Sequence, residues 1–128
     1  MGQKIKKLPE SELEAMLVVW EMQPPAAGTR ISEELARRKG WSKSTVFTLL
    51  LRLSEKGYLR CEKEGKNNYY CPLVTQDEYR AAESRSVLDR FYAGSMKNFL
   101  AAFCDESAID EKELEELRAF IDERTKGD

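Results

Sequence analysis

The side chains best suited to chemistry lie between residues 43 and 52, where the apolar residues recur with a helical period. One face of this helix is apolar, and hydroxyl, basic and aromatic side chains gather on the opposite face. The apolar face consists of Val46, Leu49, Leu50 and Leu53. In a DNA major groove, hydroxyls reach base edges, arginine reaches guanine or phosphate, and phenylalanine contacts thymine methyl groups. The residues predicted to contact DNA here are Lys43, Ser44, Thr45, Phe47, Thr48 and Arg52.

An outward apolar pair, Phe47 and Leu51, admits three interpretations. The two side chains contact base methyl groups in the groove, they pack against another element such as the N-terminal arm, or they belong to a surface that binds a protein partner. Arg52 also has an alternative to DNA contact, because a single arginine is more often solvated or ion-paired than bound to a base. Salt-sensitive retention on heparin or DNA separates a DNA binder from a protein-interaction module.

The composition excludes most enzyme classes. The chain has 128 residues and no histidine, which removes the commonest general base and the commonest metal ligand. The three cysteines are Cys61, Cys71 and Cys104; they are far apart and form no C-x-x-C pair, which disfavours a disulfide framework or a zinc ribbon. We therefore expect no enzymatic activity, no cofactor and no metal site. Cys61 and Cys71 would face each other across a hairpin centred on Lys66, so a metal or redox switch remains an alternative to two buried apolar side chains.

The helices and strands that position these residues are predicted from the spacing of apolar residues and from the capping and turn residues between them. Apolar spacing predicts helices over 9–22, 29–39 and 42–56, the last capped by Ser42 and stopped by Gly57. Extended patterns over 58–63 and 69–73 predict a two-stranded hairpin. This order is typical of a winged helix-turn-helix. The polar tip of the hairpin is predicted to contact the DNA backbone; the alternative is an ordinary polar turn. The tip residues concerned are Lys63, Lys66 and Asn67.

The remainder of the chain is predicted to be helical, as one long segment over 76–104 and a second helix from Asp110 to Ile121. Residues 1–80 hold 14 basic and 11 acidic side chains, a net charge of +3, whereas residues 81–128 hold 7 and 12, a net charge of −5. Two isolated helices cannot enclose the apolar side chains of this region, so we expect a second copy to cover them. The alternative is that these helices fold back on the winged domain. The predicted dimerisation residues are Phe91, Phe99, Leu100, Phe103, Leu114, Leu117 and Ile121.

The predicted fold class is therefore mostly α with a small β wing. A winged helix-turn-helix domain over residues 1–75 is followed by C-terminal dimerisation helices over residues 76–128. The longest apolar run near the N-terminus, Ala15 to Trp20, is far shorter than the roughly 20 residues of a membrane span. We expect a cytoplasmic protein that does not insert into a membrane.

Four segments of the chain resemble the penicillinase-repressor family, the BlaI/MecI/CopY group. They are LPESELEAMLVVW at 8–20, WSKSTVFTLLLRLSEKGYL at 41–59, YCPL at 70–73 and ELEELR at 113–118. The resemblance implies a homodimeric winged-helix transcriptional repressor that binds an inverted-repeat operator in double-stranded DNA. It also implies that Thr45, Thr48 and Arg52 lie at the DNA and that position 47 varies with the operator.

The resemblance further implies how repression is relieved. In the antibiotic-response branch, a membrane sensor-protease triggers cleavage within the dimerisation region. The comparable bond here joins Ala102 and Phe103, and Ala102 stands where the best-known members carry asparagine. The copper-responsive branch carries Cys-x-Cys pairs near its C-terminus, whereas Cys104 is the one cysteine in this part of the chain.

Overall fold

The computed structural model describes residues 5–106 and 109–126. The chain forms two compact units, Met1–Ser84 and Arg85–Asp128, here called the N-terminal unit and the C-terminal unit. The N-terminal unit contains helices α1 (Glu10–Glu21), α2 (Gly28–Lys39) and α3 (Lys43–Glu55). It also contains strands β1 (Ala26–Ala27), β2 (Leu59–Glu64) and β3 (Asn67–Pro72). Helix α4 (Gln76–Tyr92) begins just after the expected domain boundary at 75/76, and the two units divide within it.

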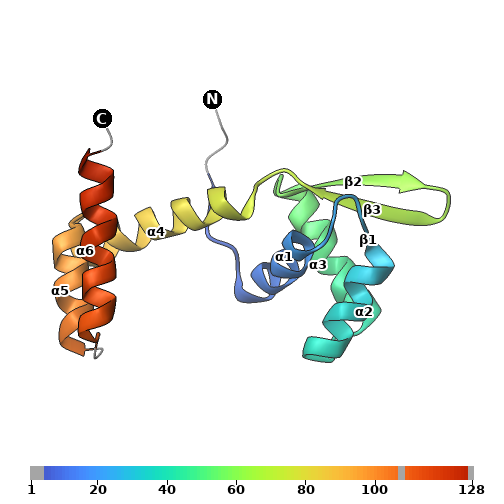
Figure 1. The fold of residues 1–128 in the computed structure, drawn as a ribbon. Coiled ribbons are helices and arrows are strands. Elements are labelled where there is room, and N and C mark those ends of the chain that lie inside the picture. Colours follow the sequence, from blue (N-terminus) through green and yellow to red (C-terminus); the bar gives the residue numbers. More distant parts are fainter. Residues whose placement is uncertain (1–4, 107–108, 127–128) are drawn as a thin grey trace. The chain divides into compact units, whose positions relative to one another are not determined.

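Helices α1, α2 and α3 pack on one another beside the sheet (Figure 1), which confirms the predicted winged-helix architecture. The predicted apolar face of α3 is buried as expected, with Val46, Leu50 and Leu53 completely covered. Gly40 ends α2 in the left-handed conformation, with φ of 71°. The Ser42 side chain accepts a hydrogen bond from the Thr45 backbone N–H at 3.2 Å, which confirms the predicted cap of α3.

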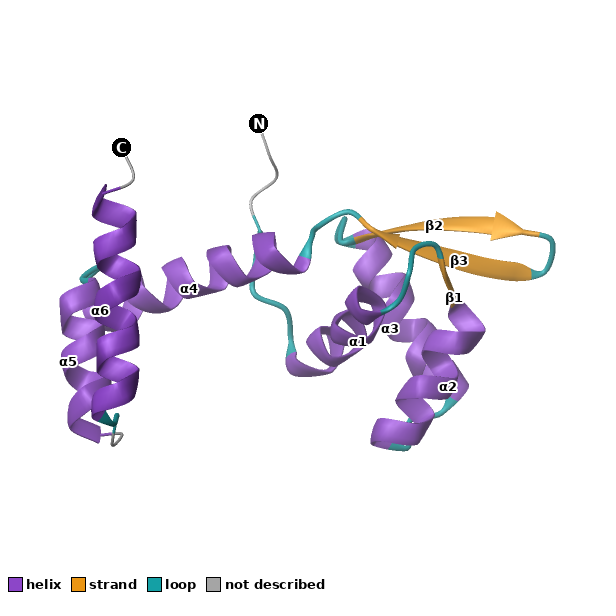
Figure 2. Ribbon diagram, in the orientation of Figure 1, coloured by secondary structure: helices purple, strands orange, loops and turns teal. Residues whose placement is uncertain are grey.

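The sheet has three strands in the order β1–β3–β2, all antiparallel (Figure 2). The sequence prediction of a two-stranded hairpin missed β1, because two alanines carry no alternating pattern. The hairpin turn lies at Gly65 and Lys66, between the paired residues Glu64 and Asn67. This centre differs by half a residue from the expected one at Lys66, and the difference changes which side chains share a face of the hairpin.

The cysteines show the consequence of this register. Cys61 pairs with Tyr70, and Cys71 pairs with Arg60. Neighbouring residues of a strand point to opposite faces, so the two thiols lie on opposite faces of the hairpin. The expectation that Cys61 and Cys71 face each other is therefore wrong. Cys61 is also exposed rather than buried.

Polar contacts attach the start of α4 to the rest of the N-terminal unit. The Tyr79 hydroxyl accepts a hydrogen bond from the Leu8 backbone N–H at 2.9 Å, and its ring lies 5.8 Å from that of Trp20. The Trp20 indole N–H donates to the Val74 carbonyl at 2.9 Å. The Tyr58 hydroxyl donates to the Lys6 carbonyl. These bonds satisfy the polar ends of three aromatic side chains that pack in or beside the core.

An ion pair with one buried partner joins the start of α1 to the end of α3. Glu12 is a charged side chain in the core, 3% exposed as a residue, and its carboxylate pairs with the Lys56 ammonium. A carboxylate removed from water needs such a partner, because an unpaired buried charge is strongly unfavourable. Both residues occur in the segments that carry the family resemblance, and the structure gives them this physical role.

The C-terminal unit holds the rest of α4 together with α5 (Met96–Glu106) and α6 (Glu111–Lys126). The expected continuous helix over 76–104 is wrong: it is interrupted after Tyr92, where Ala93 and Gly94 adopt φ of 51° and 74°. The Asp110 carboxylate accepts from the Glu113 backbone N–H at 2.9 Å, which confirms the predicted cap of the last helix. Among the described residues, no helix is long and apolar enough to cross a membrane.

Candidate nucleic-acid interface

The outward face of α3 is open to solvent along its length. Burial of Val46, Leu50 and Leu53 against α1 and α2 fixes the rotation of the helix, and the opposite residues must then point outward. Five of the six residues predicted on this helix are exposed. They are Lys43, Ser44, Thr45, Thr48 and Arg52. The helix therefore presents two cations and three hydroxyls, the donor and acceptor types that base edges and phosphates require.

A hollow of about 390 Å³ runs along this face. Four of the predicted residues line it, so the structure brings these four together. Ser11, at the start of α1, and Trp41, in the turn before α3, also line the hollow, and sequence reasoning did not single them out. The complete lining is Ser11, Trp41, Ser44, Thr45, Thr48, Leu49 and Arg52.

The hydroxyls at the start of α3 are already partly engaged. The Thr48 hydroxyl donates to the Ser44 carbonyl at 2.9 Å. The Ser42 hydroxyl lies 3.0 Å from that of Thr45, and both belong to the cap of the helix. Because the Thr48 proton is used within the helix, its free lone pairs are suited to accept hydrogen bonds from base amino groups.

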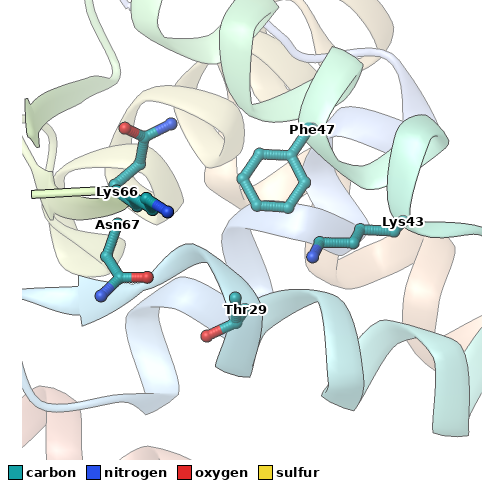
Figure 3. Close-up of a pocket in the computed structure, with 6 residues that line it drawn as sticks. Thr29, Lys43, Phe47, Lys66 and Asn67 are labelled. Carbon is teal, nitrogen blue, oxygen red and sulfur yellow. The ribbon is translucent and has the colours of Figure 1, made fainter.

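A second hollow, of about 310 Å³, lies between the start of α3 and the tip of the hairpin. Figure 3 shows the Phe47 ring between Lys43 on one side and Lys66 and Asn67 on the other, with Thr29 of α2 facing them. Asn68 completes the lining. Two lysines and two amides therefore gather where the wing meets the helix. Lys63 is exposed farther along β2, opposite Asn68, and does not line this hollow.

Phe47 and Leu51 differ in their surroundings, although they lie one turn apart. Phe47 is half-buried against the core, whereas Leu51 is 58% exposed. Packing against another element therefore describes Phe47, but the element is the start of α2 at Gly28 and not the N-terminal arm. The two side chains do not form one continuous exposed apolar surface, which weakens the protein-interaction reading of this pair.

Tyr70 lies beside Phe47 and was not identified from sequence. Burial, together with the neighbouring Cys61 thiol, raises the pKa of Tyr70 to about 12. Gly28 was also not identified from sequence. A glycine after two alanines has no sequence signature, and its value lies in the close approach of Phe47 and Tyr70 to its backbone.

The basic end of α2 is largely neutralised. Hydrogen bonds from Arg37 and Arg38 lower the pKa of the Glu34 carboxyl, and Arg38 also pairs with Glu21. Lys39 lies 3.6 Å from Glu14. The cations of this end are therefore paired, whereas no ion pair within the described residues involves Lys43, Arg52, Lys63 or Lys66. These four side chains of α3 and the wing are therefore free to contact an anion.

Comparison with known proteins extends over most of the chain. The family model described as penicillinase repressor matches residues 8–123. The chain is 32% identical to the penicillinase repressor of Bacillus licheniformis over 94% of its own length and 93% of that protein. It is 28% identical to the methicillin resistance regulatory protein MecI of Staphylococcus aureus, over 97% of its own length and all of MecI.

Among the solved structures that match, two each cover about three-fifths of the chain. The solution structure of the DNA-binding domain of the repressor BlaI covers 61% of the chain and 94% of that domain, with 35% identity and a TM-score of 0.54. A monomeric form of Bacillus licheniformis BlaI, solved in complex with the blaP half-operator, covers 59% of the chain and 92% of its own length, with 36% identity and a TM-score of 0.51. With the sequence match across residues 8–123, these likenesses establish that the chain belongs to the penicillinase repressor family.

Proposed function

We propose that this protein is a transcriptional repressor that binds an inverted-repeat operator as a homodimer. The observation that carries the proposal is the open face of α3, where Thr48 and Arg52 share one hollow while the wing supplies Lys66 beside the start of the same helix. The family supports it: the similar BlaI was solved with a half-operator. Occupancy of a promoter by two copies would block transcription.

The proposed roles divide between base recognition and phosphate contact. Ser44, Thr48 and Arg52 face the groove, and Lys43, Thr45 and the wing residues contact the backbone on either side. Phosphate contacts supply most of the affinity without reading sequence, and the side chains on the helix supply selectivity.

Replacing Arg52 by alanine is expected to weaken specific binding by about 1–3 kcal/mol, and the same holds for Thr48→Ala, because each removes a hydrogen bond to a base edge. The probe is a duplex selected from a random pool by the wild-type protein, with the dissociation constant measured by fluorescence anisotropy. Arg80→Ala is the matched control, because Arg80 is an exposed arginine on α4 away from α3. Unchanged affinity in Arg52→Ala would refute the assignment of α3 as the recognition helix.

Replacing Lys66 by alanine is expected to lower the affinity for every duplex by a similar factor. Each lost phosphate contact also reduces the slope of log affinity against log salt by about 0.9. Lys63→Ala is expected to behave in the same way. Lys97→Ala, an exposed lysine on α5, serves as the control and should leave the slope unchanged. A loss restricted to some base sequences would contradict a backbone-contacting wing.

The C-terminal unit supports the homodimer. Every residue of α6 is described, and none of them is buried within the chain. Phe91, Phe103, Leu114 and Ile121 are between 42% and 68% exposed, although all four are large and apolar. Exposure of several large apolar side chains in one small unit is typical of an interaction surface, and we propose that a second copy covers them with the same surface across a two-fold axis.

We infer that repression is relieved by a signal that acts on the C-terminal unit. The Ala102–Phe103 bond, where the family resemblance places regulatory cleavage, lies inside α5, so a protease must first unwind this helix. A membrane sensor-protease is the proposed partner for this step. After separation of the two copies, each would bind through the contacts of one half-site, whereas the dimer binds through two.

A further inference from the structure

The edge of the Phe47 ring lies against the start of α2. A Cβ atom placed on Gly28 would lie 2.8 Å from Cε1 and 2.9 Å from Cζ of the Phe47 ring, and 3.2 Å from Cε2 of Tyr70. Carbon atoms do not approach this closely without displacement, so the ring edge occupies the space that any larger residue at position 28 would need. The absence of a side chain at Gly28 therefore leaves a space at the start of α2, and the edge of the Phe47 ring occupies it.

Three elements that are separate in the sequence meet at this space. Phe47 belongs to α3, Gly28 begins α2, and Tyr70 belongs to β3. Ala26, two residues before Gly28, pairs with Tyr70 in the sheet, so the same two segments are also connected by backbone hydrogen bonds. The Phe47 ring therefore lies at the junction between the helix and the base of the wing.

The side chains around the ring are those proposed to contact phosphates. Lys43 Nζ lies 5.9 Å from the centroid of the ring, and Lys66 and Asn67 approach from the wing side (Figure 3). A lysine ammonium within about 6 Å of a ring centroid is attracted to the face of the ring. The Phe47 ring therefore lies next to the cation of the helix, and Lys66 and Asn67 of the wing line the same hollow.

We propose that Phe47 is a positioning residue for DNA binding, which holds the wing at a fixed distance from α3 and does not itself read a base. This inference rests on the proposed function and deepens it. Phe47 sets where Lys66 and Asn67 lie relative to Thr48 and Arg52, so that both sets contact one duplex. Leu51, exposed one turn farther along, is the apolar side chain of α3 that is free to contact a thymine methyl group.

Positioning and base reading differ in what a substitution changes. Loss of the Phe47 ring would let the wing move relative to α3, so phosphate contacts would be lost on every duplex and the slope of log affinity against log salt would fall. Loss of a methyl contact instead changes discrimination at one base pair and leaves the slope unchanged. Mobility of the wing also changes in the free protein, where no DNA is present.

The experiment uses the full chain with Phe47→Ala, Phe47→Leu and the matched control Leu51→Ala. The first readout is hydrogen exchange of the amides of residues 60–64 in the protein without DNA. The second is the salt slope of binding to a duplex selected from a random pool by the wild-type protein, and the third is discrimination among single-base variants of that duplex. A thermal melt confirms that each variant is folded.

Phe47→Ala is expected to exchange the wing amides several-fold faster and to lower the salt slope by about one to two, with unchanged base discrimination. Leu51→Ala should leave wing exchange and slope as in the wild type. Gly28→Ala should resemble Phe47→Ala, because the added methyl group displaces the ring. Gly28→Ala combined with Phe47→Leu should recover most of the slope, because the shorter side chain makes room for the methyl group.

Wild-type wing exchange and salt slope in Phe47→Ala, with discrimination lost at one base pair, would overturn the inference and make Phe47 a base-contacting residue. Absence of recovery in the double variant would also overturn it. Failure of the proposed function is recognised separately, because a wild-type chain that selects no duplex still reports wing exchange in the first readout.

Discussion

Glutamates introduced at Leu114 and Ile121 together are expected to make the protein monomeric and to weaken its binding to a duplex with two half-sites by about 100-fold or more. The two positions lie seven residues apart, on one face of α6, and both are close to half exposed in the single chain. Two carboxylates buried in a symmetric apolar interface would each meet the same charges from the second copy, which strongly opposes association.

The large effect on DNA binding follows from the loss of linkage between half-sites. In a dimer, the first bound copy holds the second at a high local concentration over the neighbouring half-site, which raises the overall affinity without any new contact. A monomer retains the affinity of a single copy. Binding to a single half-site should therefore be nearly unchanged in the variant, while the advantage of the second half-site disappears.

Ala119→Glu is the control, because Ala119 is exposed on the opposite face of α6 and the substitution adds one of the two glutamates there. Sedimentation equilibrium at micromolar protein gives the mass, and anisotropy on one-site and two-site duplexes gives the affinities. A variant that sediments as a dimer, or a control that is also monomeric, would contradict this interface.

Replacing Lys56 by methionine is expected to reduce the free energy of unfolding by about 2–3 kcal/mol, because it leaves the Glu12 carboxylate buried without its partner. The value lies below that of a completely buried pair, since the Lys56 side chain is 42% exposed. Urea unfolding followed by circular dichroism measures it directly, and the melting temperature should fall by about 10 °C.

Two further variants isolate the cause. Glu12→Leu combined with Lys56→Met should be close to the wild type, because removal of both charges leaves no unpaired group. Lys39→Met removes a partner from the half-exposed Glu14 and should cost less than about 1 kcal/mol. Equal losses in Lys56→Met and Lys39→Met would show that burial of Glu12 does not matter.

The features that could be predicted from sequence are those with a strong local signal. The buried face of α3 follows from apolar residues at a helical spacing, and Ser42 and Asp110 follow from the chemistry of helix caps. The exposed residues of the candidate interface then follow from geometry, since a helix that buries one face must present the other. The order of the elements follows from the changes of period and the turn residues between them, and the family resemblance added the expectation of a homodimer on an operator.

The features that could not be predicted depend on contacts between distant residues. Strand β1 exists because Ala26 and Ala27 lie beside β3, and two alanines have no extended pattern of their own. The register of Cys61 depends on the exact centre of the turn at Gly65 and Lys66. The interruption at Ala93 and Gly94 lies inside a run of apolar residues that continues with a helical period on both sides. Gly28 acquires its role only when Phe47 and Tyr70 are placed over it.

The hydrogen bond between the Leu8 N–H and the Tyr79 hydroxyl joins residues that are 71 positions apart. During synthesis, the segment before α1 leaves the ribosome early, whereas its partners Tyr58 and Tyr79 follow much later. The N-terminal unit therefore closes only when the first turn of α4 has been made, and long-range closure of this kind slows folding. A nascent chain that ends at residue 75 contains α1 to α3 and all three strands, together with Tyr58, but it lacks the Tyr79 hydroxyl that accepts the hydrogen bond from Leu8.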